Sequence, residues 1–193
     1  MASTKALLGL GGASAVGAGS LGGYLYSSST EPNKDTFRSR YSLALIQDSE
    51  DTIWSKKLTA LSTGSPKNKG LIDAKSKNTS DSLKKACKGI YDSHFSQDLM
   101  DDFKNFCSKH YADQFSNKQT IAADTDLNGK WETFKGKTSS DLSGELLKIH
   151  ESKKDSSSEP DGWKKLVFDE CKKLSTSIFE GEIKGYQEFC TKQ

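Results

Sequence analysis

Cysteine and histidine are the side chains in this chain of 193 residues with the most chemical potential, and it contains four of the first and three of the second. Cys107 and His110 are three positions apart, so a helix would place them on one face. Together with Cys87 and His94 they could form a Cys₂His₂ zinc site. Alternatively, Cys107 and His110 could act as a thiolate nucleophile and its base.

A second candidate site is acidic. Asp124, Asp126 and Asn128, followed by Gly129, match D-x-D-x-N-G, the first half of a calcium-binding loop. Oxygen ligands in this pattern suit a hard cation held in a sharp turn. The last position of such a loop is a bidentate glutamate, but here it is Lys135, whose charge opposes Ca²⁺. We therefore predict that these residues cap the start of the tryptophan helix that follows, and we predict no metal and no cofactor.

The charge pattern argues against a nucleic-acid partner. Lysine and arginine together number 28 and aspartate and glutamate 26, so the formal net charge is only +2. Lysines are interspersed with acidic residues, which is typical of a solvated helix surface. No phosphate-binding loop, G-x-S-x-G or H-E-x-x-H motif occurs, and Gly136-Lys137-Thr138 matches only the end of a phosphate loop. The sequence therefore predicts neither an enzyme nor a nucleic-acid-binding protein.

Helices must position these residues, because apolar side chains recur at helical spacing. The three apolar stripes are Leu83, Ala86, Cys87, Ile90 and Tyr91; Leu99, Phe103, Phe106, Cys107 and His110; and Trp163, Leu166, Val167, Cys171, Leu174 and Ile178. Residues 37–45 alternate in polarity and could form one short strand, but one strand cannot make a sheet. The predicted fold class is all-α. Residues 27–35, 62–70 and 153–161 are predicted loops, the last two dispensable for folding.

The body repeats one order of features. A tryptophan helix, a Ser-rich loop, C-K-x-[IL] and [FY]-x-x-F-C-[ST]-K occur in the first half and again in the second. This order predicts a duplicated helical hairpin, with repeats at 37–120 and 121–193. Where the first repeat has His94 and His110, the second has Ile178 and Gln193. A structural metal would be expected in both copies, so the repeat argues against the zinc site and the nucleophile.

The same symmetry predicts how the cysteines pair. In an antiparallel hairpin, residues equidistant from the turn face each other. The midpoint of Cys87 and Cys107 lies beside a break in the apolar period, and the midpoint of Cys171 and Cys190 lies next to Gly181. We therefore predict the disulfides Cys87–Cys107 and Cys171–Cys190. The alternatives are four reduced cysteines buried as small apolar residues, or pairing between repeats.

The N-terminal segment is uncharged from Ala6 to Tyr26, long enough to span a bilayer. Its small residues recur every fourth position, which would give a helix a close-packing face in lipid. These residues are Gly11, Ala15, Gly19 and Gly23. Residues 1–27 are therefore predicted to be a membrane anchor or a signal peptide, with Ala13-Ser14-Ala15 as the cleavage motif of the second alternative. Residues 28–36 are predicted to be a flexible linker.

Residues 1–12, with the run STKALLGLGG, resemble the leader of a large paralogous family of N-terminally anchored proteins in haemotropic mycoplasmas. Residues 36–43 resemble the short segment that follows that leader. The resemblance implies membrane association, surface variation and a Lys- and Ser-rich body with a tryptophan helix and spaced cysteines. It implies no catalytic or binding residue.

These observations predict a membrane-anchored, non-catalytic surface protein that presents a small helical body to a host protein or an antibody. The even number of cysteines in a small body with few apolar residues favours an extracellular location. Lys34, Arg38 and Arg40 outnumber Lys5 around the apolar segment, which favours the opposite orientation, but long translocated domains override that bias. The alternatives are secretion after signal cleavage, and a small calcium- or zinc-binding module or metal-dependent enzyme.

Overall fold

The computed structural model describes residues 35–115 and 117–192. The chain divides after Asn33, and every described residue belongs to the second unit, Lys34–Gln193. Its secondary structure is helical, with four isolated bridges and no extended strand among the described residues. The prediction of an all-α fold is confirmed.

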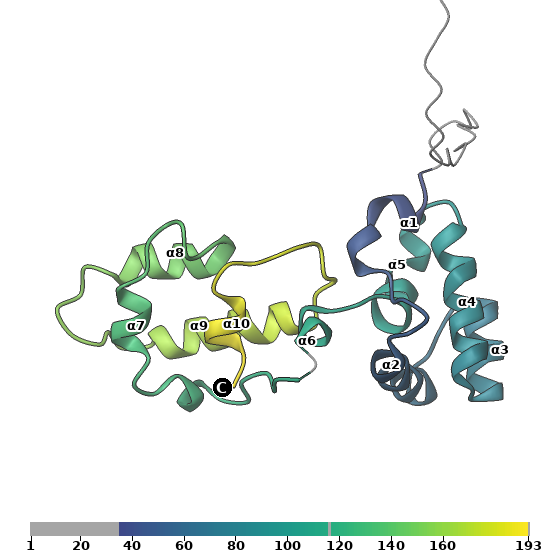
Figure 1. Cartoon of the computed structure of the whole chain (residues 1–193), viewed down its shortest axis with the longest axis horizontal. Helices are drawn as coiled ribbons and strands as arrows, with labels where there is room; N and C mark the ends of the chain where they lie inside the picture. The colour runs from purple at the N-terminus through teal and green to yellow at the C-terminus, as the bar shows by residue number, and fades with distance from the viewer. Residues whose placement is uncertain (1–34, 116, 193) are drawn as a thin grey trace, which may run out of the picture. The chain divides into compact units, whose positions relative to one another are not determined.

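The elements of the first half are α1 (Phe37–Arg40), the 3-10 helix η1 (Ser42–Ala44), α2 (Asp51–Thr63), α3 (Lys69–Lys77), α4 (Ser80–Asp92), the 3-10 helix η2 (Gln97–Leu99), α5 (Met100–Asp102) and the π-helix η3 (Phe103–Cys107). The elements of the second half are α6 (Tyr111–Gln114), the 3-10 helix η4 (Asp124–Leu127), α7 (Trp131–Lys135), α8 (Gly144–Lys153), α9 (Trp163–Ser175) and α10 (Tyr186–Cys190). Figure 1 shows α3 and α4 side by side, joined by the Asn78–Thr79 turn.

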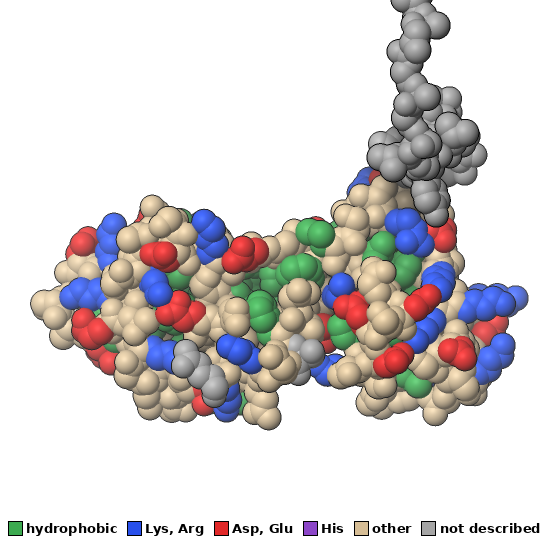
Figure 2. Space-filling view, viewed as in Figure 1, with side chains coloured by type: hydrophobic (Ala, Val, Ile, Leu, Met, Phe, Trp, Pro, Cys, Tyr) green, Lys and Arg blue, Asp and Glu red, His purple; other side chains and the backbone are tan. Residues whose placement is uncertain are grey.

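Two hydrophobic cores organise these helices. The first is built around Trp54 and Phe103, and its members come from residues 37–107 plus Ile178. The second is built around Trp163 and Phe134, and its members come from residues 111–190. Tyr111, predicted to belong to the first repeat, therefore packs in the second core. Charged side chains of both signs are interspersed over the surface in view (Figure 2), as the sequence pattern indicated.

Each core is closed by the same kind of backbone pairing. The residue before α1, Thr36, bridges His94, and the residue before α6, His110, bridges Ile178. A second pair of bridges, Leu45 with Ser108 and Thr120 with Thr191, follows each core's second cysteine. The neighbouring hydrogen bonds also correspond. Lys109 N–H donates to the Ala44 carbonyl and Lys192 N–H donates to the Gln119 carbonyl, both with a donor–acceptor distance of 2.7 Å.

Several expected boundaries are wrong. Residues 37–45 form α1 and η1 instead of a strand, because Thr36 and Ser39 form a capping box that starts a helical turn. The helix through Phe103 and Cys107 ends at Cys107 as a π-helix, so His110 lies beyond it, at the cap of α6. Ile178 likewise lies beyond the end of α9.

One predicted loop is shorter than expected and the other is displaced by one residue. Thr63 ends α2 and Lys69 begins α3, which leaves residues 64–68 as the connection. That connection is tied to the first core, because the buried carboxylate of Asp102 accepts hydrogen bonds from the backbone N–H groups of Lys67 and Asn68. Lys153 belongs to α8, so the second loop is residues 154–162.

The predicted anchor, residues 1–27, lies outside the described residues, and with it the small-residue face formed by Gly11, Ala15, Gly19 and Gly23. Of the predicted linker 28–36, only Asp35 and Thr36 are described, and the Thr36 side chain caps α1. Within residues 35–115 and 117–192, no helix has both the length and the apolar character needed to cross a bilayer.

Candidate functional site

The four cysteines form two disulfides. Cys87 of α4 is bonded to Cys107 of η3, with Cα atoms 5.2 Å apart, and Cys171 of α9 is bonded to Cys190 of α10, with Cα atoms 5.1 Å apart. Both separations are normal for a disulfide. The predicted pairing is confirmed, and no cysteine among the described residues is free.

The disulfides overturn the two Cys–His hypotheses. Zinc ligation and nucleophilic attack both require a thiolate, and the sulfur atoms of Cys87 and Cys107 are bonded to each other. His110 does not share a helix face with Cys107, because the helix ends between them. His94 instead lies at the bridge with Thr36. These residues therefore form neither a zinc site nor a Cys–His catalytic pair.

The calcium-like sequence is held by protein groups. The carboxylate of Asp126 accepts hydrogen bonds from the backbone of Ala122 and Ala123 at 2.7 and 3.2 Å, and Lys192 Nζ lies 3.2 Å away. The backbone bond from Ala122 and the Lys192 ion pair hold the pKa of Asp126 below its usual value. Asn128 accepts from Lys164 Nζ at 2.9 Å, and Asp124 begins η4. Among residues 35–115 and 117–192, no three acidic, histidine or cysteine side chains gather as a metal would require.

The capping prediction is correct in kind but wrong in place. Asp126 caps the turn that leads into η4, whereas the tryptophan helix α7 begins after Lys130 without a side-chain cap. The first core has a matching contact, in which Glu50 accepts from Gln47 N–H at 2.6 Å and its carboxylate lies 3.3 Å from Lys109 Nζ. Asp126 therefore does in the second core what Glu50 does in the first. This is a structural role.

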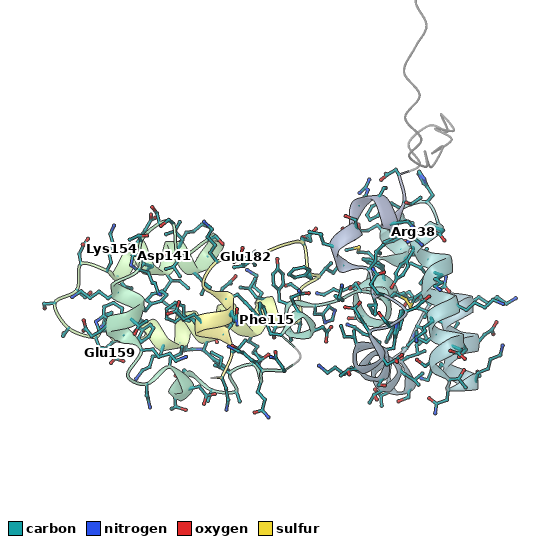
Figure 3. The ribbon with its side chains drawn as sticks, viewed as in Figure 1. Arg38, Phe115, Asp141, Lys154, Glu159 and Glu182 are labelled. Atoms are coloured by element: carbon teal, nitrogen blue, oxygen red, sulfur yellow. A yellow bond between two sulfur atoms is a disulfide. The ribbon has the colours of Figure 1, made fainter. Side chains whose placement is uncertain are left out.

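An aromatic groove of about 440 Å³ opens on the second core. Its aromatic lining is Tyr111, Phe115, Phe179 and Tyr186, and its rim includes Glu182 and Glu188. Phe115 at the end of α6 and Glu182 in the segment after α9 are labelled in Figure 3. A hollow of this volume is of the size that small ligands or single side chains occupy.

Backbone pairing brings these rings together from distant parts of the sequence. Tyr111 N–H donates to the Ser177 carbonyl at 3.2 Å, and Phe179 N–H donates to the Lys109 carbonyl at 2.9 Å. The rings of Tyr111 and Phe179 consequently meet edge to face, with centroids 5.2 Å apart, and Tyr111 and Tyr186 lie 5.4 Å apart. Gly185 sets the start of α10 with φ +87°, and a Cβ there would lie 2.5 Å from Leu142.

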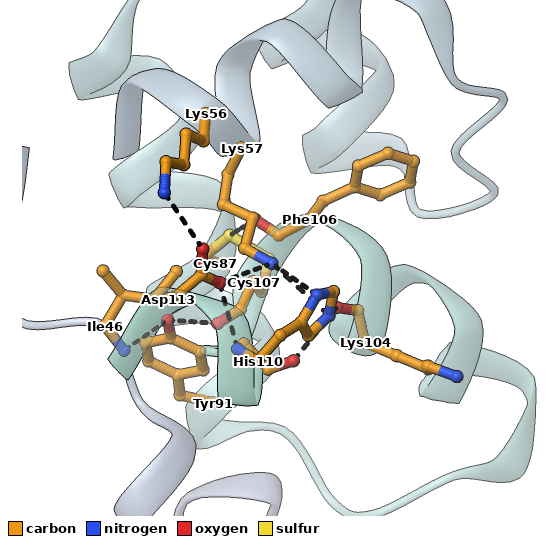
Figure 4. Close-up of polar contacts among 11 residues, drawn as sticks. Ile46, Lys56, Lys57, Cys87, Tyr91, Lys104, Phe106, Cys107, His110 and Asp113 are labelled. Carbon is orange, nitrogen blue, oxygen red and sulfur yellow. Dashed lines mark hydrogen bonds and ion pairs between the residues drawn. A yellow bond between two sulfur atoms is a disulfide. The ribbon is translucent and has the colours of Figure 1, made fainter. Parts of the chain in front are cut away.

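A buried polar cluster joins the two halves of the chain (Figure 4). Lys57 Nζ of α2 lies 3.4 Å from Asp113 Oδ2 of α6 and 3.4 Å from each ring nitrogen of His110. Lys57 is 4% exposed and Asp113 is 8% exposed. His110 Nε2 lies 2.7 Å from the Lys104 carbonyl. Because a carbonyl only accepts, Nε2 carries the hydrogen and Nδ1 is the acceptor that faces the Lys57 ammonium.

Burial and mutual charge set the protonation of this cluster. Burial lowers the pKa of Lys57, and the nearby Asp113 carboxylate opposes that shift. Burial and the positive charge of Lys57 lower the pKa of His110 from 6.5, so the imidazole is neutral at pH 7. Three such groups could in principle transfer protons. Of these three residues, however, only His110 lines the neighbouring groove of about 670 Å³. The cluster is therefore built to hold two elements together.

Sequence reasoning missed both the groove and the cluster. It used Tyr186 only as part of a repeated motif, and it placed His110 in an apolar stripe and in the zinc and Cys–His hypotheses. One available signal was the pair of aromatic residues Tyr111 and Phe115 at helical spacing, which repeats the spacing of Phe37 and Tyr41. Nothing in the local sequence distinguishes Lys57 from the exposed lysines around it.

Comparison of the chain with protein-family models, curated proteins and solved structures gives no match. The function must therefore be argued from the residues described above.

Proposed function

We propose that this chain is a membrane-anchored, non-catalytic surface protein whose helical body meets a host protein or an antibody outside the cell. The observation that carries the proposal is that each hydrophobic core contains its own disulfide, Cys87–Cys107 in one and Cys171–Cys190 in the other. Disulfides persist in oxidising compartments and are rare in the cytoplasm. The proposal places residues 1–27 in the membrane, in keeping with their uncharged run and with the resemblance of the leader.

We also propose that the body arose by internal duplication of a helical hairpin. The repeated bridges, the matching disulfides and the equivalent ion pairs Glu50–Lys109 and Asp126–Lys192 support this origin. They favour a start of the second copy near Lys109, earlier than the boundary at residue 121 that the sequence pattern indicated. A scaffold with a disulfide in each of its two cores and with exposed connections is suited to present a variable surface.

Protease shaving of intact cells that produce the full chain tests the location. We expect trypsin to release peptides from residues 64–68 and 154–162, whose lysines lie in exposed connections. Lysed cells provide the control for cleavability. If the same peptides appear only after lysis, the body faces the cytoplasm and the proposal is wrong. Recovery of the whole body in the medium, with a new N-terminus after Ala15, would instead support secretion.

A further inference from the structure

The two cores carry matching groups of four aromatic side chains. In the first core the group is Phe37, Tyr41, Phe95 and Phe103, and in the second it is Tyr111, Phe115, Phe179 and Tyr186. The correspondence follows from the backbone, because the first ring of each group comes directly after Thr36 or His110 and the third directly after His94 or Ile178, the bridged residues. The spacing between the first and third rings agrees closely, whereas the fourth ring lies 4.8 Å from the first ring in the first core and 5.4 Å in the second. Phe37 lies 5.1 Å from Phe95, and Tyr111 lies 5.2 Å from Phe179.

In the first core this aromatic group holds a cation that the chain supplies. The guanidinium carbon of Arg40 lies 3.7 Å from the centre of the Phe95 ring. Nε and Nη2 of the same guanidinium donate to the two carboxylate oxygens of Asp35. This bond holds the pKa of Asp35 below its usual value. A planar guanidinium can stack on a ring and pair with a carboxylate at the same time, which an ammonium cannot do as well.

At the corresponding position of the second core the chain has a neutral side chain. Arg40 is the fourth residue after Thr36, and the fourth residue after His110 is Gln114, which is exposed and lines the groove. Arg40 itself does not line the groove but a neighbouring hollow of about 180 Å³, which shares Phe179 with it. Of the described residues that line the 440 Å³ groove, none is a lysine or an arginine. The second aromatic group thus keeps the rings of the first and has a glutamine where the first has its guanidinium.

The rim of the groove has the charge that would attract a cation. Glu182 is exposed at the rim, and Glu188, the second acidic lining residue, is paired with Lys137 at 2.7 Å. Burial, with the negative charge of Asp113 as a smaller contribution, raises the pKa of Tyr186 to about 12, so this ring is neutral at pH 7. Phe115 and Phe179 are only partly buried, so part of each ring surface is accessible.

We propose that this groove binds the guanidinium group of an arginine side chain from a partner peptide, in the place that Arg40 takes in the first core. The ring of Phe179 would carry the stacked guanidinium, and Glu182 would supply the carboxylate that Asp35 supplies to Arg40. The inference deepens the proposed function and rests on it only for the source of the peptide. Binding is a property of the purified chain and does not depend on where the body lies in a cell.

The test is a titration of the purified full chain with a capped Gly-Arg-Gly peptide, followed by NMR of the aromatic protons. The matched peptides contain lysine, or citrulline as a neutral analogue of arginine of nearly the same shape. We expect saturable binding of the arginine peptide, about fivefold weaker binding of the lysine peptide and no binding of the citrulline peptide. Tetramethylammonium is the final probe, and tighter binding of that cation than of the arginine peptide would overturn the choice of guanidinium.

Variants then assign the binding to the groove. Gln114→Arg should supply the cation within the chain and abolish binding, and Phe179→Leu should weaken binding about fivefold. Phe168→Leu, at a partly buried position of the same core that does not line the groove, is the matched control and should bind normally. Arg40→Gln should free the first aromatic group and add a second binding event. Circular dichroism checks that each variant folds.

Unchanged binding by Gln114→Arg, equal binding of citrulline and arginine, or no saturable binding at all would each overturn the inference. None of these results depends on protease shaving. A body that faces the cytoplasm and still binds arginine would refute the proposed function alone. An exposed body that does not bind arginine would refute the groove assignment alone.

Discussion

At the scale of single residues, the buried ion pair between Lys57 and Asp113 should be sensitive to substitution. Both side chains are nearly removed from water, and each supplies the main opposite charge for the other. Removal of one partner leaves an unpaired buried charge, which is costly. Counted from Trp54 in the first core and Trp131 in the second, Lys57 corresponds to Phe134, which is fully buried in the second core.

Asp113→Asn and Lys57→Met should each lower the free energy of unfolding by about 3 kcal/mol. The double variant should lose less than the sum of the two, since the second change removes a charge that the first has left unpaired. Urea unfolding measures all three. Lys56→Met is the control, because the Lys56 side chain is half exposed and its Nζ lies 3.8 Å from Asp113 Oδ1, and it should cost less than about 1 kcal/mol. Equal losses for Lys56→Met and Lys57→Met would contradict this assignment.

His110 should make stability depend on pH near neutrality. Its pKa lies below 6.5 in the folded chain because of burial and the Lys57 charge. Between 6.5 and the lowered pKa, the unfolded chain binds more protons than the folded chain, so stability falls as pH decreases through this window. Asp113 of α6 and Lys104 of η3 also face the ring, and Asp113 opposes the shift. The carboxylates with lowered pKa, such as Asp126, act only in more acid solution, below about 4.

Thermal unfolding from pH 7.5 to 5 measures this effect. His110→Gln keeps a donor for the Lys104 carbonyl and should flatten the dependence in that window. His94→Gln changes an exposed histidine and should leave the slope as it is in the natural chain. If the slope disappears with His94→Gln and persists with His110→Gln, His94 causes the pH dependence and this prediction is wrong.

At the scale of elements, the connection between α2 and α3 shows that the composition of a loop does not reveal whether its backbone is hydrogen-bonded to the core. The sequence predicts that residues 62–70 and 153–161 are equally dispensable. The structure gives the first connection two hydrogen bonds to Asp102, and Asn68 caps α3 through its bond from Leu71 N–H at 3.2 Å. Asp102 is 2% exposed and lies more than thirty residues away in the sequence, so composition alone could not indicate it.

Asp102→Ala should therefore cost about 2 kcal/mol, since two buried backbone N–H groups lose their acceptor. Deletion of residues 154–158, which keeps the Glu159 carboxylate that accepts from Trp163 Nε1, should cost less than about 1 kcal/mol, because closure entropy changes slowly with loop length. Chemical denaturation of the two variants decides between these expectations. A deletion that destabilises the chain more than Asp102→Ala would show that the second connection is anchored too.

Features of the fold that depend on residues within one segment could be predicted from the sequence, whereas features that depend on contacts between distant segments could not. The helices around Cys87 and Cys171 were predictable because each carries an apolar stripe within one segment, and the disulfides followed from their symmetry. The four-residue helix α6 offers only the spacing of Tyr111 and Phe115 as a signal, and its partners come from residues 177–179. That spacing does not show which distant rings complete the aromatic groove. The burial of Lys57 was not predictable either, because its partner follows it by more than fifty residues.

At the scale of the whole molecule, two disulfides divide the stabilisation between the two cores. Each closes a loop of 19 or 20 residues and should contribute about 3 kcal/mol by restricting the unfolded chain. The Cys171→Ser/Cys190→Ser variant should lose about this amount by calorimetry. Alkylation without reductant, read by mass spectrometry, should modify none of the four cysteines in the natural chain. Full alkylation would contradict the oxidised state.

Lys109 has a further consequence, because its backbone belongs to both cores. Its N–H donates to Ala44 of the first core, and its carbonyl accepts from Phe179 beside the second. No loop without such hydrogen bonds separates the two cores at Lys109, so unfolding of one core should remove a hydrogen bond from the other. We expect the two cores to melt in a single cooperative transition in spite of their separate interiors. Each folded core would then protect the backbone of the other core from proteolysis.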